Sequence, residues 1–195
     1  MTRATPLPPD ERRAALIAAT EPLLEEFGRE VSTRQIAEAA SVAEGTIFRV
    51  FTTKEALIDA VLEEVFDVQR TCDELRRIDL GLDLQTRLAA ATQVLQTRLR
   101  KVFALFHSMR LGPPRPDQHD IRTRQKIDNE RLIAEIVRLL QPDHDRLRIP
   151  PDEAANALRA MTFALTHPII NNGRQPRPEQ IVDLVLHGIT TEAEC

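Results

Sequence analysis

The side chains best suited to binding chemistry lie close together between positions 28 and 54. The basic ones outnumber the acidic ones by one, giving this stretch a net charge of +1: Arg29, Arg34, Arg49 and Lys54 against Glu30, Glu38 and Glu44. Guanidinium and ammonium groups donate charge-assisted hydrogen bonds to phosphate oxygens. The pattern suits contact with a polyanion, but one copy of the chain offers few such contacts, so we expect two copies to act together.

Two short helices must position these groups. The apolar spacing predicts helices over residues 33–40 and 43–50 with only Ser41 and Val42 between them, a tight helix-turn-helix. A helix held at a fixed angle by such a turn can enter a DNA major groove, which is about 12 Å wide. Its first residues then meet the base edges: Ala43, Glu44, Gly45 and Thr46. A carboxylate there is tolerated chiefly where it accepts from cytosine N4.

Apolar residues recur at helical spacing along nearly the whole chain, which predicts an all-α fold. Further helices are expected over residues 10–27, 52–75, 84–110, 120–140, 151–166 and 178–189. The apolar stripe over 84–110 fits either one long helix or two abutting ones. Pro22 predicts a bend in the first helix, because proline removes one backbone hydrogen bond, and Gly28 predicts that helix's end.

Two helix starts carry capping signals. Ser32 with Gln35, and Thr52 with Glu55, have the spacing of a capping box, in which each partner's side chain accepts from the other's backbone N–H. Between the two short helices the sequence predicts one apolar cluster, made of Ile36, Ala37, Ala40, Val42, Ile47 and Phe51.

Residues 31–57 carry a recognisable pattern. They read ValSerThrArgGlnIleAlaGluAlaAla at 31–40, SerValAlaGluGlyThrIlePheArgValPhe at 41–51 and ThrThrLysGluAlaLeu at 52–57. With the amphipathic helix before them, these segments closely resemble the DNA-binding module of the TetR/AcrR family of bacterial transcriptional regulators. The resemblance covers about the first third of the chain, and the remainder resembles the family only in layout.

The resemblance implies a set of DNA contacts from both short helices and the start of the next. Carried onto this chain, the family's pattern gives Thr33, Arg34, Thr46, Phe48, Arg49 and Lys54. Four positions depart from it: Ser41 stands where glycine is common, Ala43 where a capping serine is, Phe48 where a tyrosine is, and Val50 where histidine or tyrosine is. We therefore expect a specific, salt-sensitive and weaker binder.

The resemblance also implies an organisation of about nine helices in two domains. We expect a flexible tail at 1–9, a helix-turn-helix domain at 10–55, and a ligand-binding and dimerisation domain at 56–195. The last two helices are expected to pack against their copies in a homodimer, since the first of them is apolar on two sides. The expected partners are a palindromic operator in double-stranded DNA, a second copy of the chain and an unknown small-molecule effector.

The ligand-contact candidates lie on the 84–110 stripe and the 151–166 helix with its end. They are Phe103, Phe106, His107, Met109, Arg110, Phe163 and His167. Because aromatic residues make up only 4% of the chain, we expect a pocket lined by aliphatic groups. His107 or Arg110 is the expected polar contact for an anionic or carbonyl-bearing ligand.

Other function classes find little support in the sequence. The net charge of −4 over 195 residues argues against nucleic-acid binding by bulk charge. No phosphate loop, serine elbow or HExxH is present, so no enzyme, metal or cofactor is expected. Asp143 to Asp145 is interpreted as a solvated loop and Cys72 as a buried thiol. Without a secretory signal or an apolar span, the protein is expected in the bacterial cytoplasm.

We predict a ligand-released repressor, and two alternatives stay open. One is an activating or ligand-independent DNA-binding regulator. The other is a helical small-molecule-binding protein or enzyme whose N-terminal module is only structural.

Overall fold

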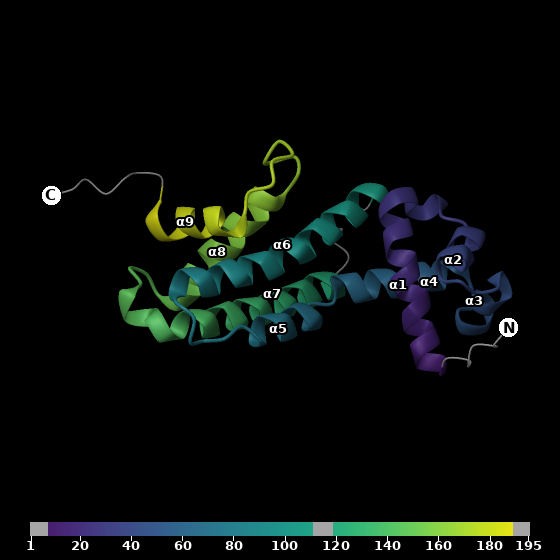
Figure 1. Ribbon diagram of the computed structural model, residues 1–195, viewed down its shortest axis with the longest axis horizontal. Helices are drawn as coiled ribbons and strands as arrows, with labels where there is room; N and C mark the ends of the chain where they lie inside the picture. Colours follow the sequence, from purple (N-terminus) through teal and green to yellow (C-terminus); the bar gives the residue numbers. More distant parts are fainter. Residues whose placement is uncertain (1–7, 111–118, 189–195) are drawn as a thin grey trace. The chain divides into compact units, whose positions relative to one another are not determined.

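The described part of the chain consists of helices joined by short loops. The structure, a computed structural model, describes residues 8–110 and 119–188, in which no strand occurs. The α-helices are α1 (Pro9–Phe27), α2 (Thr33–Ala39), α3 (Glu44–Val50), α4 (Lys54–Phe66), α5 (Gln69–Arg76), α6 (Leu84–Ser108), α7 (His119–Leu140), α8 (Pro151–Thr166) and α9 (Pro178–His187). Two 3₁₀ helices, η1 (Gly28–Glu30) and η2 (Gln141–Arg146), complete them (Figure 1). The all-α prediction is confirmed.

The chain divides into two compact units. The first unit extends to Phe66 and also includes a later segment that begins at Ala104. The second unit contains Asp67–Phe103 and the described residues from α7 onward. Helix α6 belongs to both, since it passes from the second unit into the first after Phe103. The domain boundary after residue 55 stays a prediction about function, and most of the expected tail, 1–9, lies outside the described residues.

The first unit is built around one apolar core. Helix α1 packs against α2, α3 and α4. The core is made of Leu16, Ile17, Leu24, Val31, Ile36, Ala37, Ile47, Phe51, Leu57, Ile58, Ala60 and Val61, with Leu105 and Met109 from the end of α6. Helix α1 continues through Pro22, and Gly28 ends it as predicted. The apolar cluster predicted between the short helices is confirmed within this core.

A tight turn joins α2 to α3. The Val42 N–H donates to the Ala37 carbonyl at 2.9 Å and the Ser41 N–H to the Glu38 carbonyl at 3.1 Å, which is the Schellman pattern of helix ends. This pattern places one residue in the left-handed region, and Ser41 occupies it with φ of 54°. The capping box of Ser32 and Gln35 is present as predicted. It fixes the start of α2, so both ends of this helix are specified locally.

The prediction of one continuous helix over 52–75 is wrong. Helix α4 ends at Phe66 and α5 begins at Gln69. The Asp67 carboxylate accepts from the Gln69 N–H at 3.0 Å, so a local side-chain acceptor replaces the helical hydrogen bond and starts a new helix. The capping box expected from Thr52 is also displaced by one residue, because the Thr53 hydroxyl accepts from the Ala56 N–H at 3.0 Å.

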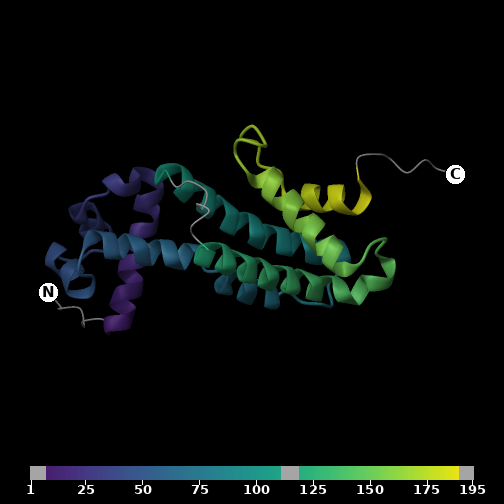
Figure 2. The same ribbon diagram turned by 180° about the vertical axis from the view of Figure 1, so that it is seen from behind.

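The second unit packs its helices in layers. In both views α5 lies on one side of α7, and α8 with α9 on the other (Figures 1 and 2). An ion pair of 2.6 Å joins Arg76 of α5 to Glu135 of α7, and the Arg138 guanidinium donates to the Leu75 carbonyl at 2.7 Å. Helix α6 is one unbroken helix, which decides between the two forms that the 84–110 stripe allowed.

A buried arginine fixes the loop regions at the start of α6 and the end of α7. Arg87 is 1% exposed. Its guanidinium donates to the carbonyls of Leu139 (2.6 Å), Leu80 (2.9 Å) and Leu82 (2.5 Å) and pairs with the Asp143 carboxylate. Asp143 therefore anchors η2 to α6, which the interpretation of 143–145 as a solvated loop did not anticipate.

The remaining helix ends differ from prediction by one or two residues. Helix α7 begins at His119, and α8 spans Pro151–Thr166 as predicted. Helix α9 ends at His187 because Gly188 adopts a φ of 78°. Ile189 and Cys195 lie outside the described residues.

Candidate nucleic-acid interface

Helix α3 presents an exposed N-terminal face. Ala43 is its N-cap and makes no side-chain cap, and Ala43, Glu44 and Gly45 are exposed while Thr46 is half-buried. A Cβ added at Gly45 would meet nothing within 4 Å. Glycine costs a helix about 1 kcal/mol relative to alanine, and nothing in the first unit requires it there. An open backbone at this point suits close approach of a ligand surface.

The first residues of α2 and α3 are linked to each other. The Thr33 hydroxyl donates to the Glu44 carboxylate, so two of the predicted DNA contacts already form a hydrogen bond. This bond orients Glu44 and leaves its remaining lone pairs as acceptors. Arg34, on the following position of α2, is exposed.

Lys54 has a structural role that the sequence reasoning missed. Its ammonium donates to the carbonyls of Arg29 and Val31, both at 3.1 Å. These bonds tie the start of α4 to the segment before α2. An ammonium has three N–H donors, so one is left for a phosphate, the contact expected for this residue.

The two phenylalanines of the motif have opposite environments. Phe51 is 4% exposed and lies in the core, with the Arg13 guanidinium 4.5 Å from its ring centroid. Phe48 is 51% exposed. Arg49 beside it is also exposed. The face of α3 therefore combines an apolar ring, a guanidinium and a carboxylate, which together can contact a thymine methyl, a guanine edge and a cytosine amino group.

Three of the seven predicted ligand contacts form a cluster of rings in the second unit. The Phe103 ring is 5.2 Å from Phe163 and 4.6 Å from His167, both in edge-on geometry. Phe106 instead pairs with Phe66 in the first unit at 5.6 Å. Met109 is buried in the core of the first unit, while His107 and Arg110 are exposed.

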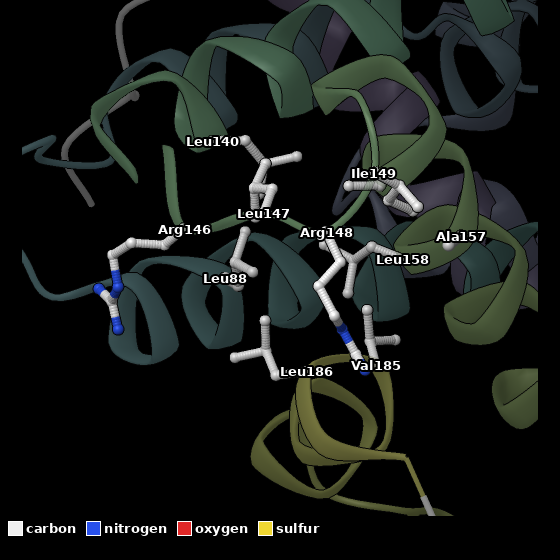
Figure 3. Close-up of a pocket in the computed structure, with 11 residues that line it drawn as sticks. Leu88, Leu140, Arg146, Leu147, Arg148, Ile149, Ala157, Leu158, Val185 and Leu186 are labelled. Carbon is white, nitrogen blue, oxygen red and sulfur yellow. The ribbon is translucent and has the colours of Figure 1, made fainter. Parts of the chain in front are cut away.

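The second unit contains a cavity that the sequence reasoning did not locate. Its volume is about 240 Å³. Most of its wall is aliphatic, with Leu88, Leu140, Leu147, Leu158, Val185 and Leu186 from α6, α7, the segment after η2, α8 and α9 (Figure 3). The expectation of an aliphatic lining agrees with this cavity, although none of the seven predicted residues lines it. Its residues come from five separate segments, so no local motif marks it.

Cys72 is confirmed as a buried thiol. It is 1% exposed, and burial, followed by the nearby Glu135 carboxylate, raises the pKa of the thiol above its ordinary value. The thiol stays protonated near neutral pH, which makes it a poor nucleophile. Across the helices that the structure describes, no segment is long and apolar enough to cross a bilayer.

Comparison with known proteins connects this geometry to one family. The family model described as "Bacterial regulatory proteins, tetR family" matches residues 16–61. This range spans most of α1, all of α2 and α3, and α4 to Val61. The match therefore falls on the elements that build and support the exposed face of α3.

Solved structures of the same fold cover nearly the whole chain. The fatty acid degradation regulator FadR from Bacillus halodurans aligns with a TM-score of 0.62 at 17% identity, covering 96% of this chain and 98% of its own. A TetR transcriptional regulator from Streptomyces coelicolor gives 0.58 at 23% identity (93% and 99% covered). NalD, the secondary repressor of the MexAB-OprM multidrug efflux pump in Pseudomonas aeruginosa, gives 0.55 at 22% (94% and 100%).

At these identities the structural matches establish the fold, and the sequence match establishes the module. The helix-turn-helix predicted from spacing, the exposed α3 face and the shared fold agree with one another. Residues 16–61 therefore carry the module of the bacterial tetR regulatory proteins, and the chain has the fold of solved TetR-family transcriptional regulators.

Proposed function

We propose that this protein is a homodimeric repressor that binds a palindromic operator and leaves it when a small molecule occupies the second unit. The observation that carries the proposal is the exposed face of α3, where Phe48 and Arg49 are exposed next to the fully buried Ile47. Phe48 leaves 51% of its surface exposed on this seven-residue helix, and contact with a thymine methyl would cover the exposed part of its ring.

The DNA contacts of one copy are few. The +1 charge of residues 28–54, and the use of two Lys54 donors inside the protein, leave little for phosphates. Two copies double the contacts and read two half-sites about one DNA turn or a multiple apart. A twofold dimer thus explains how a chain of net charge −4 holds DNA.

Helices α8 and α9 are the proposed dimer surface. Helix α8 buries Ala155, Leu158 and Thr162 within its own unit. Phe163 contacts the rings of Phe103 and His167 in the same unit and remains 43% exposed. Packing against the same helices of a second copy would cover this ring.

Helix α6 is the proposed route from ligand to DNA. We assign this role to α6 because α6 belongs to both units, whereas the expected continuous helix over 52–75 is interrupted after Phe66. At its end the Ser108 carbonyl lies so close to Gly28 that a Cβ there would be 2.3 Å away. A ligand that binds a shifted α6 more tightly would move Ser108 and, through this contact, the end of α1.

Selection from a random-sequence DNA library at moderate salt tests the proposal. We expect an enriched palindrome. The Arg49→Ala variant should bind that site about tenfold more weakly, because one base contact is worth about 1–3 kcal/mol. Arg174→Ala, an exposed arginine of the second unit, is the matched control and should bind normally. Undiminished binding by a dimeric Arg49→Ala protein would contradict the assignment of α3.

The same selected site separates the alternatives. Added effector that tightens binding, or no effector response, would favour an activating or ligand-independent regulator. A folded dimer that enriches no sequence but binds a metabolite would favour the small-molecule-binding or enzyme alternative.

A further inference from the structure

The cavity of the second unit has an aliphatic lining with two arginine side chains. Three of its aliphatic lining residues are no more than 2% exposed: Leu88, Leu140 and Leu158. No aromatic ring lines it, and the polar side chains in its lining are Arg146 and Arg148. Such a lining favours an aliphatic occupant, because polar groups placed against it would lose their hydrogen bonds to water.

The two arginines at the cavity are not equivalent. Arg146 pairs with the Asp143 carboxylate at 2.6 Å, and Figure 3 shows its guanidinium turned away from α9. Arg148 extends toward Val185 of α9. Within the described residues no carboxylate pairs with it. Arg148 therefore offers an uncommitted guanidinium beside an apolar cavity, and a guanidinium binds a carboxylate through two parallel hydrogen bonds.

The cavity is held in shape by groups outside its lining. The Arg87 guanidinium joins the Leu139 carbonyl, next to cavity residue Leu140, to Asp143 of η2. Asp143 in turn holds Arg146. The segment that carries Leu147 and Arg148 is therefore held in place at its start. Ordering this segment on ligand binding would cost little conformational entropy.

The size of the cavity limits the length of the occupant. A water molecule takes about 30 Å³ of liquid volume, so a cavity of about 240 Å³ has room for an alkyl chain of several carbons. A chain much shorter would leave part of the cavity empty, and a much longer one would extend into solvent.

We propose that this cavity binds a medium-chain aliphatic carboxylate, with the chain against Leu88, Leu158 and Val185 and the carboxylate on the Arg148 guanidinium. The binding itself is independent of any DNA-binding role. Use of the cavity as the effector site rests on the proposed function.

Calorimetric titration of the full-length protein with octanoate, octanol and butyrate, without DNA, tests the site. We expect saturable binding of octanoate, at least tenfold weaker binding of butyrate, and octanol between them. Arg148→Ala should weaken octanoate at least tenfold and leave octanol unchanged. Arg174→Ala removes an exposed arginine outside the cavity and should alter neither.

A second variant fills the cavity. Ala157 lines it and is half-buried, so Ala157→Leu should abolish binding of octanoate and octanol while circular dichroism shows a folded protein. Equal octanoate affinity in wild type and Arg148→Ala would overturn the anionic contact, and no saturable binding to wild type would overturn the site. Adding octanoate to the operator complex afterwards tests the effector role separately, because a failure there leaves the measured binding intact.

Discussion

The turn between α2 and α3 depends on the conformation of one residue. Ser41 has a φ of 54°, a region where a side chain crowds the backbone and glycine does not. Two backbone hydrogen bonds, from Ser41 to Glu38 and from Val42 to Ala37, hold it there. The strain is therefore a consequence of the tight turn, and it explains why glycine suits this position.

Replacing Ser41 by glycine should stabilise the first unit. Relief of the left-handed strain is worth about 1 kcal/mol, and the greater freedom of glycine in the unfolded chain returns about half of it. We expect a net gain of about 0.5 kcal/mol in the free energy of unfolding, measured in urea. Ser41→Ala keeps the strain and should show no gain. A gain in both variants would point to the serine hydroxyl instead.

Gly28 should tolerate no side chain. Its φ is 56°, and an added Cβ would lie 2.3 Å from the Ser108 carbonyl oxygen. Strain and overpacking each cost about 1–3 kcal/mol, so Gly28→Ala should lower the free energy of unfolding by about 3 kcal/mol. Gly188→Ala, with a φ of 78° and nothing within 4 Å, is the control for strain alone. Equal losses in the two variants would mean that the Ser108 contact adds nothing.

At the scale of elements, a buried ion pair joins α6 to η2. The Arg87 guanidinium, followed by Arg146, hydrogen-bonds the Asp143 carboxylate and lowers its pKa below the ordinary value. Three backbone carbonyls accept from three further N–H groups of Arg87. The pair is thus one part of a hydrogen-bonded set that fixes two loop regions at once.

Removing the carboxylate should be costly. Breaking a buried ion pair by deleting one partner costs about 3–5 kcal/mol. Since Arg87 keeps its three carbonyl acceptors, we expect Asp143→Ala to lose about 3 kcal/mol at pH 7 in urea unfolding. Asp145→Ala, whose side chain is 88% exposed, is the matched control and should lose less than about 0.5 kcal/mol. Equal losses of unfolding free energy in the two variants would contradict a structural role for the Arg87–Asp143 pair.

The same pair predicts a dependence on pH. Because the pKa of Asp143 is lower in the folded protein, its contribution is complete above the unfolded-state pKa of about 3.9. It is lost as pH falls through the folded value. The stability difference between wild type and Asp143→Ala should stay constant from pH 7 to about pH 5 and shrink below about pH 4. A difference that grows in acid would contradict this.

At the scale of the whole molecule, the charge balance and the exposed apolar side chains both favour a dimer. A twofold arrangement uses the same surface on both copies. A carboxylate introduced into the proposed surface would therefore be present in both copies, so that one substitution would place two charges in the interface. The exposed Phe163 of α8 is the side chain that tests this.

The Phe163→Glu variant should be monomeric. Burying two unpaired carboxylates costs several kcal/mol, so size-exclusion chromatography with light scattering should give half the wild-type mass. Operator affinity should fall at least tenfold, because each copy alone holds one half-site. Gln85→Glu makes the same charge change at an exposed position of α6 and should remain dimeric. A dimeric Phe163→Glu protein would place the interface elsewhere.

Features that depend on local interactions could be predicted from the order of the amino acids. Helical periodicity predicted the described α-helices except for the break after Phe66, and Ser32 with Gln35 predicted the start of α2, but neither 3₁₀ helix was predicted. The helix-turn-helix and its exposed Phe48 followed from spacing and resemblance, because capping, turn chemistry and helical faces involve residues a few positions apart. The break was missed because the Asp67 acceptor competes with an apolar pattern that continues past it.

Contacts between distant residues could not be predicted in this way and emerged from the packing of the helices. It placed Met109 in the core of the first unit, left Phe103 beside Phe163 and His167, and gave Lys54 two backbone partners. The cavity and the Arg87–Asp143 pair join segments more than 50 positions apart. Such contacts arise from the packing of helices against one another, which the periodicity of each helix leaves unspecified, since one apolar face can pack against many partners.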